Sequence, residues 1–217
     1  IYEKEEGVEG TFGLYTATVG YKFAKRHAAF AGFRYAGGLK VKGFNMLGEP
    51  TKDYKPYDWT IDLGYAYQMG KGFAVYATGS VIFSHLSKNA NGGAFTVGAS
   101  YQNNDMTVAN KSANFMVDAK VAAIGPKLDY GNGYKVSMPT HVAVGGALSV
   151  DMADKHQVGA AVSARYFFQP SETKVFMAGG GLEYTYNNMV SVRAGYEYGD
   201  HNLSHFTMGA GIKYRGL

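Results

Sequence analysis

Ionisable side chains are spread through this chain of 217 residues, and their spacing decides which chemistry they can perform. Asp58 and Asp62 share one side of a strand-like segment, where two carboxylates would be candidates for acid and base. General acid–base catalysis needs convergent carboxylates with perturbed pKa values, and the pattern gives no sign of either. The nearby Arg34 offers these carboxylates an ion-pair partner instead, so we expect a structural role for them.

Serine, histidine and glycine motifs are the other candidates for chemistry. Ser84-His85 and Ser204-His205 are adjacent in sequence, so each pair points to opposite faces of a strand and cannot form a nucleophile–base pair directly. The six histidines show no HxH or HExxH spacing, and the chain has no cysteine to serve as a thiolate ligand. No helical segment follows the glycines at 145–146 and 179–181, so they are not phosphate loops. We therefore expect no enzyme activity, no metal and no cofactor.

The segments that carry the charged residues alternate between apolar and polar side chains. In residues 57–68, aromatic and aliphatic side chains take every second position from Tyr57 to Tyr67, and Asp58, Thr60 and Asp62 lie between them. A strand sends successive side chains to opposite faces, so this alternation predicts a sheet with one apolar and one polar face. Asn, Gly and Asp between the segments indicate antiparallel hairpins, because these residues tolerate the backbone of tight turns.

The alternation recurs in about eleven segments, and no segment has a helical period. The predicted strands are 11–23, 28–42, 57–68, 73–85, 94–102, 113–124, 139–151, 157–168, 174–186, 190–199 and 205–214. A bulge or bend is expected at Gly37-Gly38. The predicted loops are residues 1–10 and four longer connections that we place together on the outer side: 43–56, 86–93, 103–111 and 125–138.

The composition favours a membrane-spanning barrel over a soluble β-sandwich or lipocalin-like barrel. Only 18% of the residues are charged, 18 are Tyr, and the mean hydropathy is −0.19. Tilted strands of about 9–11 residues cross a bilayer. Lipid tolerates neither charged side chains nor open sheet edges, so a closed sheet with its apolar face outside meets both demands. We predict one all-β domain over residues 1–217, an antiparallel transmembrane β-barrel. The net charge of +4, without a basic stripe, argues against nucleic acid as a partner.

The two faces of this barrel provide two sets of candidate residues. The expected lumen-facing polar network consists of charged residues on the polar side of the strands: Lys22, Arg34, Asp58, Asp62, Asp118, Lys120, Arg165, Glu183, Arg193, Glu197 and Lys213. The expected lipid-facing aromatic girdle consists of Tyr57, Trp59, Tyr65, Tyr67, Tyr184, Tyr196 and Tyr214. Charges of both signs are interspersed, which favours an ion-pair network that fills the lumen over a selective pore.

Three stretches resemble a known family. Residues 179–214 (GGGLEYTYNNMVSVRAGYEYGDHNLSHFTMGAGIKY) resemble the late strands of the PorV proteins of the type IX secretion system, which belong to the FadL-like outer-membrane barrels. Residues 29–44 (AFAGFRYAGGLKVKGF) look like the early strand pair of these proteins. Residues 122–148 are similar to the family's Gly-Pro-Lys turn, polar loop and proline-initiated strand. PorQ, a FadL-like barrel of the same system, is the alternative assignment.

This resemblance implies a fold and a role. The fold has fourteen strands, of which this chain supplies about eleven, with one more before Thr11 and two after Tyr214. The implied protein lies in the outer membrane, binds the C-terminal signal domains of secreted cargo and carries cargo from the translocon to the sortase-containing attachment complex. Its partners are outer-membrane lipid, those secretion proteins and the cargo, and it contacts them through loops and rim. The alternative function is a FadL-like channel for hydrophobic small molecules.

Overall fold

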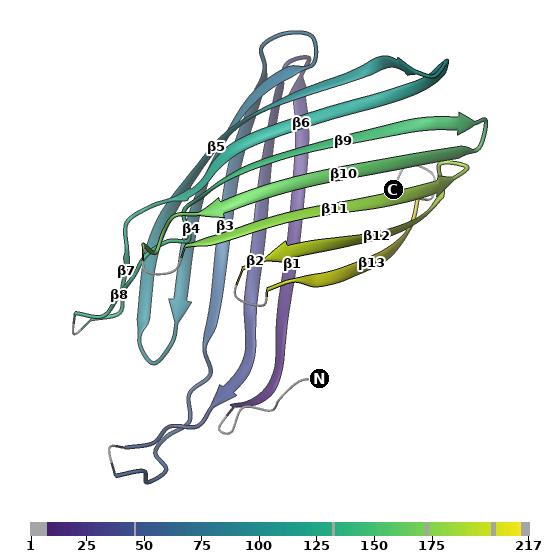
Figure 1. Cartoon of the computed structure of the whole chain (residues 1–217). Coiled ribbons are helices and arrows are strands. Elements are labelled where there is room, and N and C mark those ends of the chain that lie inside the picture. Colours follow the sequence, from purple (N-terminus) through teal and green to yellow (C-terminus); the bar gives the residue numbers. More distant parts are fainter. Residues whose placement is uncertain (1–7, 46, 132, 172–173, 201–202, 214–217) are drawn as a thin grey trace. The chain divides into compact units, whose positions relative to one another are not determined.

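The computed structural model describes residues 8–45, 47–131, 133–171, 174–200 and 203–213, and these residues form strands, turns and loops (Figure 1). No helix long and apolar enough to cross a membrane occurs among them. Eleven strands form one hydrogen-bonded sheet in the order β1-β2-β3-β4-β5-β6-β9-β10-β11-β12-β13, and β7 pairs with β8 separately. The prediction of an all-β fold with eleven principal strands is therefore confirmed for the described residues.

The observed strands follow the alternating segments of the sequence. Their bounds are β1 (Val8–Ala24), β2 (His27–Val41), β3 (Tyr57–Gln68), β4 (Phe73–His85), β5 (Asn89–Val108), β6 (Lys111–Ile124), β7 (Leu128–Asp129), β8 (Lys135–Val136), β9 (His141–Ala153), β10 (His156–Phe167), β11 (Val175–Tyr186), β12 (Val190–Gly199) and β13 (His205–Ile212). The chain divides into two compact units. The first comprises residues 1–66, 77–95 and 124–138, and the second comprises 67–76, 96–123 and 139–217.

The strand register of the second unit brings like side chains together. Val158 of β10 lies opposite Val150 of β9 on one side and Tyr184 of β11 on the other. The neighbouring position, Gly159, lies opposite Ser149 and Glu183. Registered partners share a face of the sheet, so the apolar and polar positions of each strand join into continuous rows.

The connection between β5 and β6 is much shorter than the sequence predicts. Residues 103–111 are predicted as a loop, but β5 continues to Val108 and only Ala109 and Asn110, with φ of 49° and 61°, form the turn. Two positive φ angles are what a tight hairpin turn requires. The polar residues before this turn therefore continue as strand.

The predicted placement of the four longer loops on one side is therefore wrong. The connection at 86–88 precedes β5 and the turn at 109–110 follows it, so these two lie at opposite ends of the same strand. Two other loop predictions also need correction, because residues 8–10 belong to β1 and residues 89–93 to β5. Residues 1–7 lie outside the described part of the chain.

The first unit contains the predicted bulge and a small hydrophobic core. Two residues of β1, between Gly10 and Gly13, lie opposite Gly38 alone, whose φ of 109° suits glycine. The stretch 125–138, predicted as a loop, contains the β7–β8 hairpin (Figure 1). Its side chains pack on β5 and form the buried hydrophobic cluster of the described residues: Ala90, Leu128, Tyr130 and Met138. Most large apolar side chains lie elsewhere and stay exposed, such as Leu63 at 64% and Val162 at 67%.

Candidate functional site

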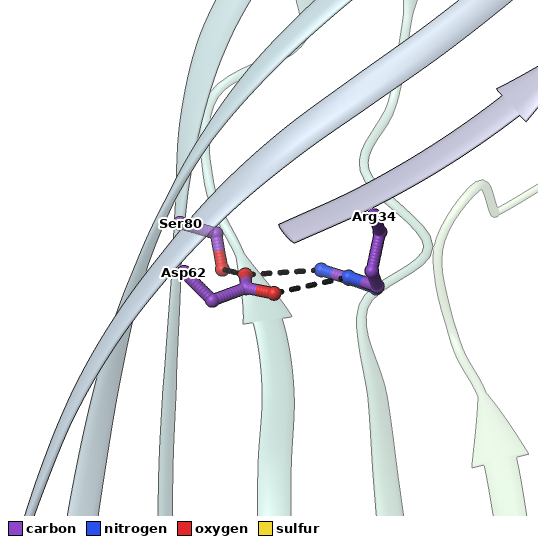
Figure 2. Close-up of polar contacts among 3 residues, drawn as sticks. All are labelled: Arg34, Asp62 and Ser80. Carbon is purple, nitrogen blue, oxygen red and sulfur yellow. Dashed lines mark hydrogen bonds and ion pairs between the residues drawn. The ribbon is translucent and has the colours of Figure 1, made fainter. Parts of the chain in front are cut away.

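An ion pair and a hydrogen bond to the same carboxylate join three strands on the polar face of the first unit (Figure 2). The Arg34 guanidinium on β2 donates hydrogen bonds of 3.0 and 3.1 Å to the two carboxylate oxygens of Asp62 on β3. Ser80 on β4 donates a third hydrogen bond to the same carboxylate. Arg34 is therefore the partner of Asp62, as the sequence predicts, whereas Asp58 is exposed and is not its partner. The Asp62 carboxylate accepts three hydrogen bonds that join neighbouring strands, which indicates a structural role for it.

Two contacts on the polar face of the second unit cross a glycine. Arg165 on β10 pairs with Glu197 on β12 at 2.5 Å, and Gly179 of the intervening β11 lies opposite Glu197. Tyr76 on β4 donates to both oxygens of Asp118 on β6, at 3.0 and 2.8 Å, and its ring lies against Gly98. A glycine has no side chain to obstruct such a bridge.

The remaining residues of the predicted polar network divide into two groups. Arg193 on β12 lies 3.6 Å from Glu183 on β11, and both side chains are well exposed. The other members take part in no ion pair among the described residues: Lys22, Asp58, Lys120 and Lys213. Six ion pairs occur within the described ranges, and five of the eleven predicted network residues take part in none of them, including Asp118, which accepts hydrogen bonds from Tyr76 instead. The polar face is thus partly neutralised by local pairing.

A shallow groove of about 630 Å³ lies along the polar face of the second unit. Its floor is a patch of residues with small side chains or none: Ala147, Ser149, Gly159, Ala161, Ser163, Gly179, Gly181 and Gly195. Glu183, Arg193 and His205 supply polar groups along its sides. At the glycines of this floor the sequence pattern excludes a phosphate loop, but the groove itself was not predicted. The signal was present as small residues at the polar positions of four consecutive strands.

Aromatic side chains form rows on the apolar face of the first unit. Trp59 of the predicted girdle stacks on Phe83 with ring centroids 3.9 Å apart, and Tyr57 stacks on His85 at 5.1 Å. Tyr65 shares a 2.6 Å hydrogen bond with His27. Histidines at strand ends therefore belong to these rows, which sequence reasoning did not anticipate.

The other girdle residues lie in the second unit or beyond the described residues. Tyr184 shares a 2.6 Å hydrogen bond with His156, and Tyr196 is exposed on β12. Tyr67 is half-buried, and Tyr214 lies outside the described residues.

The geometry offers no reactive centre among the described residues. Ser84 accepts a hydrogen bond from Tyr130, and His85 bonds to Asn89 instead. Ser204 likewise bonds to the backbone of Gly199. Nowhere in the described ranges do three or more His, Asp or Glu side chains gather as metal ligands would.

The fold was compared with those of solved protein structures. The fold resembles the crystal structures of two toluene transporters, at identities that establish likeness of fold alone. For TbuX of Ralstonia pickettii the TM-score is 0.53 at 14% identity, covering 90% of this chain and 71% of that one. For TodX of Pseudomonas putida the TM-score is 0.54 at 12% identity, and the match covers 96% of this chain and 80% of that one. None of the curated proteins compared with the sequence matches it significantly.

One family model matches, and its match spans most of the chain. It is described as type IX secretion system protein PorV and matches residues 14–174. The match covers most of β1 and all of β2 to β10, including two of the three stretches on which the sequence resemblance rests, 29–44 and 122–148. The third stretch, 179–214, lies beyond the matched residues. The match favours PorV over PorQ. The chain therefore belongs to the PorV family and is an outer-membrane protein of the type IX secretion system.

Proposed function

We propose that the sheet closes into a single transmembrane β-barrel, of fourteen strands in the full protein. The apolar rows with Trp59 and Tyr65 face lipid, and the paired charges with Arg34 and Asp62 face the lumen. Large apolar side chains are exposed along most strands, which is costly in water and favourable in a bilayer. Charges that pair with one another suit a lumen, because they satisfy their hydrogen bonds away from lipid.

Within the type IX system, this barrel binds the C-terminal signal domains of secreted cargo and carries cargo from the translocon to the attachment complex. The family match over residues 14–174 is the observation that carries this function. The family is one of secretion proteins rather than enzymes, which agrees with a polar face built from structural ion pairs. The role then requires recognition of other proteins, and exposed loops are the parts of a barrel best placed for it.

Two ordered connections of the first unit are the best candidates for contacting cargo. The loop after β2 is held by an antiparallel bridge between Val41 and Tyr54 and another between Phe44 and Pro50. It exposes Phe44 at 58% and Leu47 at 83%. The β7–β8 hairpin exposes Tyr134 at 59%. Exposed apolar side chains on an ordered loop serve as interface anchors, because little conformational entropy is lost on binding.

Affinity purification of the tagged full-length protein from outer membranes tests this role. We expect translocon, attachment-complex proteins and cargo to co-purify with the wild type, and cargo to be lost from the triple variant Phe44→Ser, Leu47→Ser, Tyr134→Ser. A matched control, Met69→Ser with Met189→Ser, removes exposed methionines from tight turns and should retain cargo. Equal cargo recovery with all three proteins would contradict the assignment of these loops.

A second candidate function is a channel for hydrophobic small molecules. The likeness of fold to two toluene transporters and the groove of about 630 Å³ favour it. The charged pairs beside the groove weigh against it, because an apolar solute gains little there. Recovery of the barrel without secretion proteins, but with a hydrophobic small molecule bound, would support this function over cargo carriage.

A further inference from the structure

A pocket of about 690 Å³ lies in the first unit, where the apolar face of β2–β4 meets the loop at 43–56. Two kinds of side chain dominate its lining. Tyr35, Tyr57 and His85 contribute rings from three consecutive strands. Lys52 and Lys55 contribute cationic groups from the loop. The pocket therefore combines an aromatic wall with a basic rim.

The aromatic wall continues from the pocket along the apolar face. Tyr57 stacks between Tyr35, with ring centroids 6.3 Å apart, and His85, with ring centroids 5.1 Å apart. Two residues further along the same strands, Trp59 stacks on Phe83. Positions two apart on a strand share a face, so the pocket and the apolar surface are continuous. Such a surface fits a ligand that has a polar head and a hydrocarbon tail.

The basic rim has an excess of positive charge that the pocket itself does not neutralise. Asp53 is the acidic residue of the lining, and it is paired with Lys40 at 2.7 Å. The hydrogen bond from Lys40 lowers the pKa of Asp53, so this pair stays ionised. Lys52 and Lys55 are exposed and form no ion pair among the described residues. They are the cations left for an anionic ligand.

The loop that carries these lysines is held in place before any ligand binds. Val41 and Tyr54 exchange two backbone hydrogen bonds of 2.8 and 3.0 Å, and the Thr51 amide donates to the Gly43 carbonyl at 2.7 Å. The pair between Lys40 and Asp53 ties the loop to the end of β2. A preorganised loop keeps its cations at the mouth of the pocket at a low entropic cost on binding.

We propose that this pocket binds the anionic, phosphate-bearing headgroup of a membrane lipid. Lys52 and Lys55 pair with the phosphate, the rings of Tyr35, Tyr57 and His85 line the headgroup, and the acyl chains follow Trp59 and Phe83. Aromatic belts occur where membrane proteins meet headgroups, and lysines beside them attract anionic lipids. The inference rests on the proposed placement of the apolar face in lipid, but it does not require cargo binding.

Native mass spectrometry of the full-length protein in mild detergent tests the proposal with defined probes. The lipids are phosphatidylglycerol, a phosphorylated glucosamine-disaccharide lipid and zwitterionic phosphatidylcholine, and inorganic phosphate serves as a competitor. We expect one tightly retained anionic lipid, and its affinity should fall roughly 20- to 30-fold in the Lys52→Gln, Lys55→Gln variant. The control Lys88→Gln, Lys127→Gln makes the same charge change outside the pocket and should keep wild-type affinity.

The outcomes separate this site from general electrostatic attraction and from the cargo role. Equal losses in the two double variants, or equal affinity for phosphatidylcholine, would overturn the proposal. Displacement by inorganic phosphate at concentrations comparable to the lipid would overturn the role of the acyl chains. Preference for the glycolipid or for the glycerolipid supports the site and identifies the source of the phosphate. Tyr57→Ser, which leaves charge unchanged, should also weaken retention. Retained lipid in a preparation that has lost cargo would count against the proposed function alone.

Discussion

Replacement of Asp62 by Asn tests whether the polar face is stabilised by specific pairs. Asp62 accepts two hydrogen bonds from Arg34 and one from Ser80. Bonds to a charged group contribute about 1.5–3 kcal/mol each, but an exposed ion pair contributes only about 0.2–1 kcal/mol. The Arg34 side chain is 54% exposed and that of Asp62 is 14% exposed, so solvent screens one partner of this pair. We therefore expect Asp62→Asn to lower the free energy of unfolding by about 1–2 kcal/mol, with about 1 kcal/mol of it coupled to Arg34.

The assay is a double-mutant cycle with Arg34→Gln, measured by urea unfolding from phospholipid vesicles. Asp58→Asn is the matched control, because Asp58 is on the same strand at an equivalent polar position and has no ion pair among the described residues. We expect this control to change the free energy of unfolding by less than about 0.5 kcal/mol. A coupling below about 0.3 kcal/mol, or an equal loss from Asp58→Asn, would refute the reasoning.

Three further predictions concern packing, pairing and the hairpin. Gly98→Ala should lower the free energy of unfolding by about 2 kcal/mol, because a Cβ would meet the Tyr76 ring and would lie 2.9 Å from the Ala119 carbonyl oxygen. In the control Gly79→Ala the Cβ enters open space, so the free energy of unfolding in urea should hardly change. Arg165→Gln should cost about 1 kcal/mol and Arg193→Gln less than half of that, because their ion pairs span 2.5 and 3.6 Å and the second is more exposed. Tyr130→Phe removes the hydrogen bond to buried Ser84, so it should lower the free energy of unfolding by about 1 kcal/mol and increase proteolysis within 125–138. Tyr134→Phe, at an exposed position of the same hairpin, should have neither effect. Equal proteolysis of both variants would contradict this.

Alternation of apolar and polar side chains predicts the bounds of a strand well where the alternation continues to both ends of that strand. The strands at 57–68, 73–85 and 190–199 are found with the predicted bounds. The strand at 94–102 is observed as 89–108, because its outer residues are polar and alternation marks only the part with an apolar face. The turn at Ala109-Asn110 contains no glycine, although both residues have positive φ. Local composition therefore could not locate the C-terminal end of β5.

Side-chain pairing depends on register, which the sequence supplies only in part. Arg34 and Asp62 lie on consecutive strands, so their pairing was predictable from strand order. Arg165 and Glu197 lie two strands apart, and their contact depends on Gly179 between them. The lysine-rimmed pocket depends on how the loop at 43–56 folds against β2–β4, which no periodicity indicates. Sequence reasoning thus identified many of the polar residues but not how they group.

In the proposed barrel, the apolar face of the strands meets lipid and the charged face does not. Residues 1–217 contain no cysteine, so single cysteines that carry nitroxide spin labels can be placed along β3 with no competing label on this part of the protein. The measurement is the accessibility of each label to oxygen and to a water-soluble nickel complex, in the full-length protein reconstituted in vesicles. We predict oxygen-accessible labels at Ile61, Leu63 and Tyr65 and nickel-accessible labels at Asp58 and Asp62. Nickel accessibility at all five positions, or oxygen accessibility at Asp62, would contradict the account.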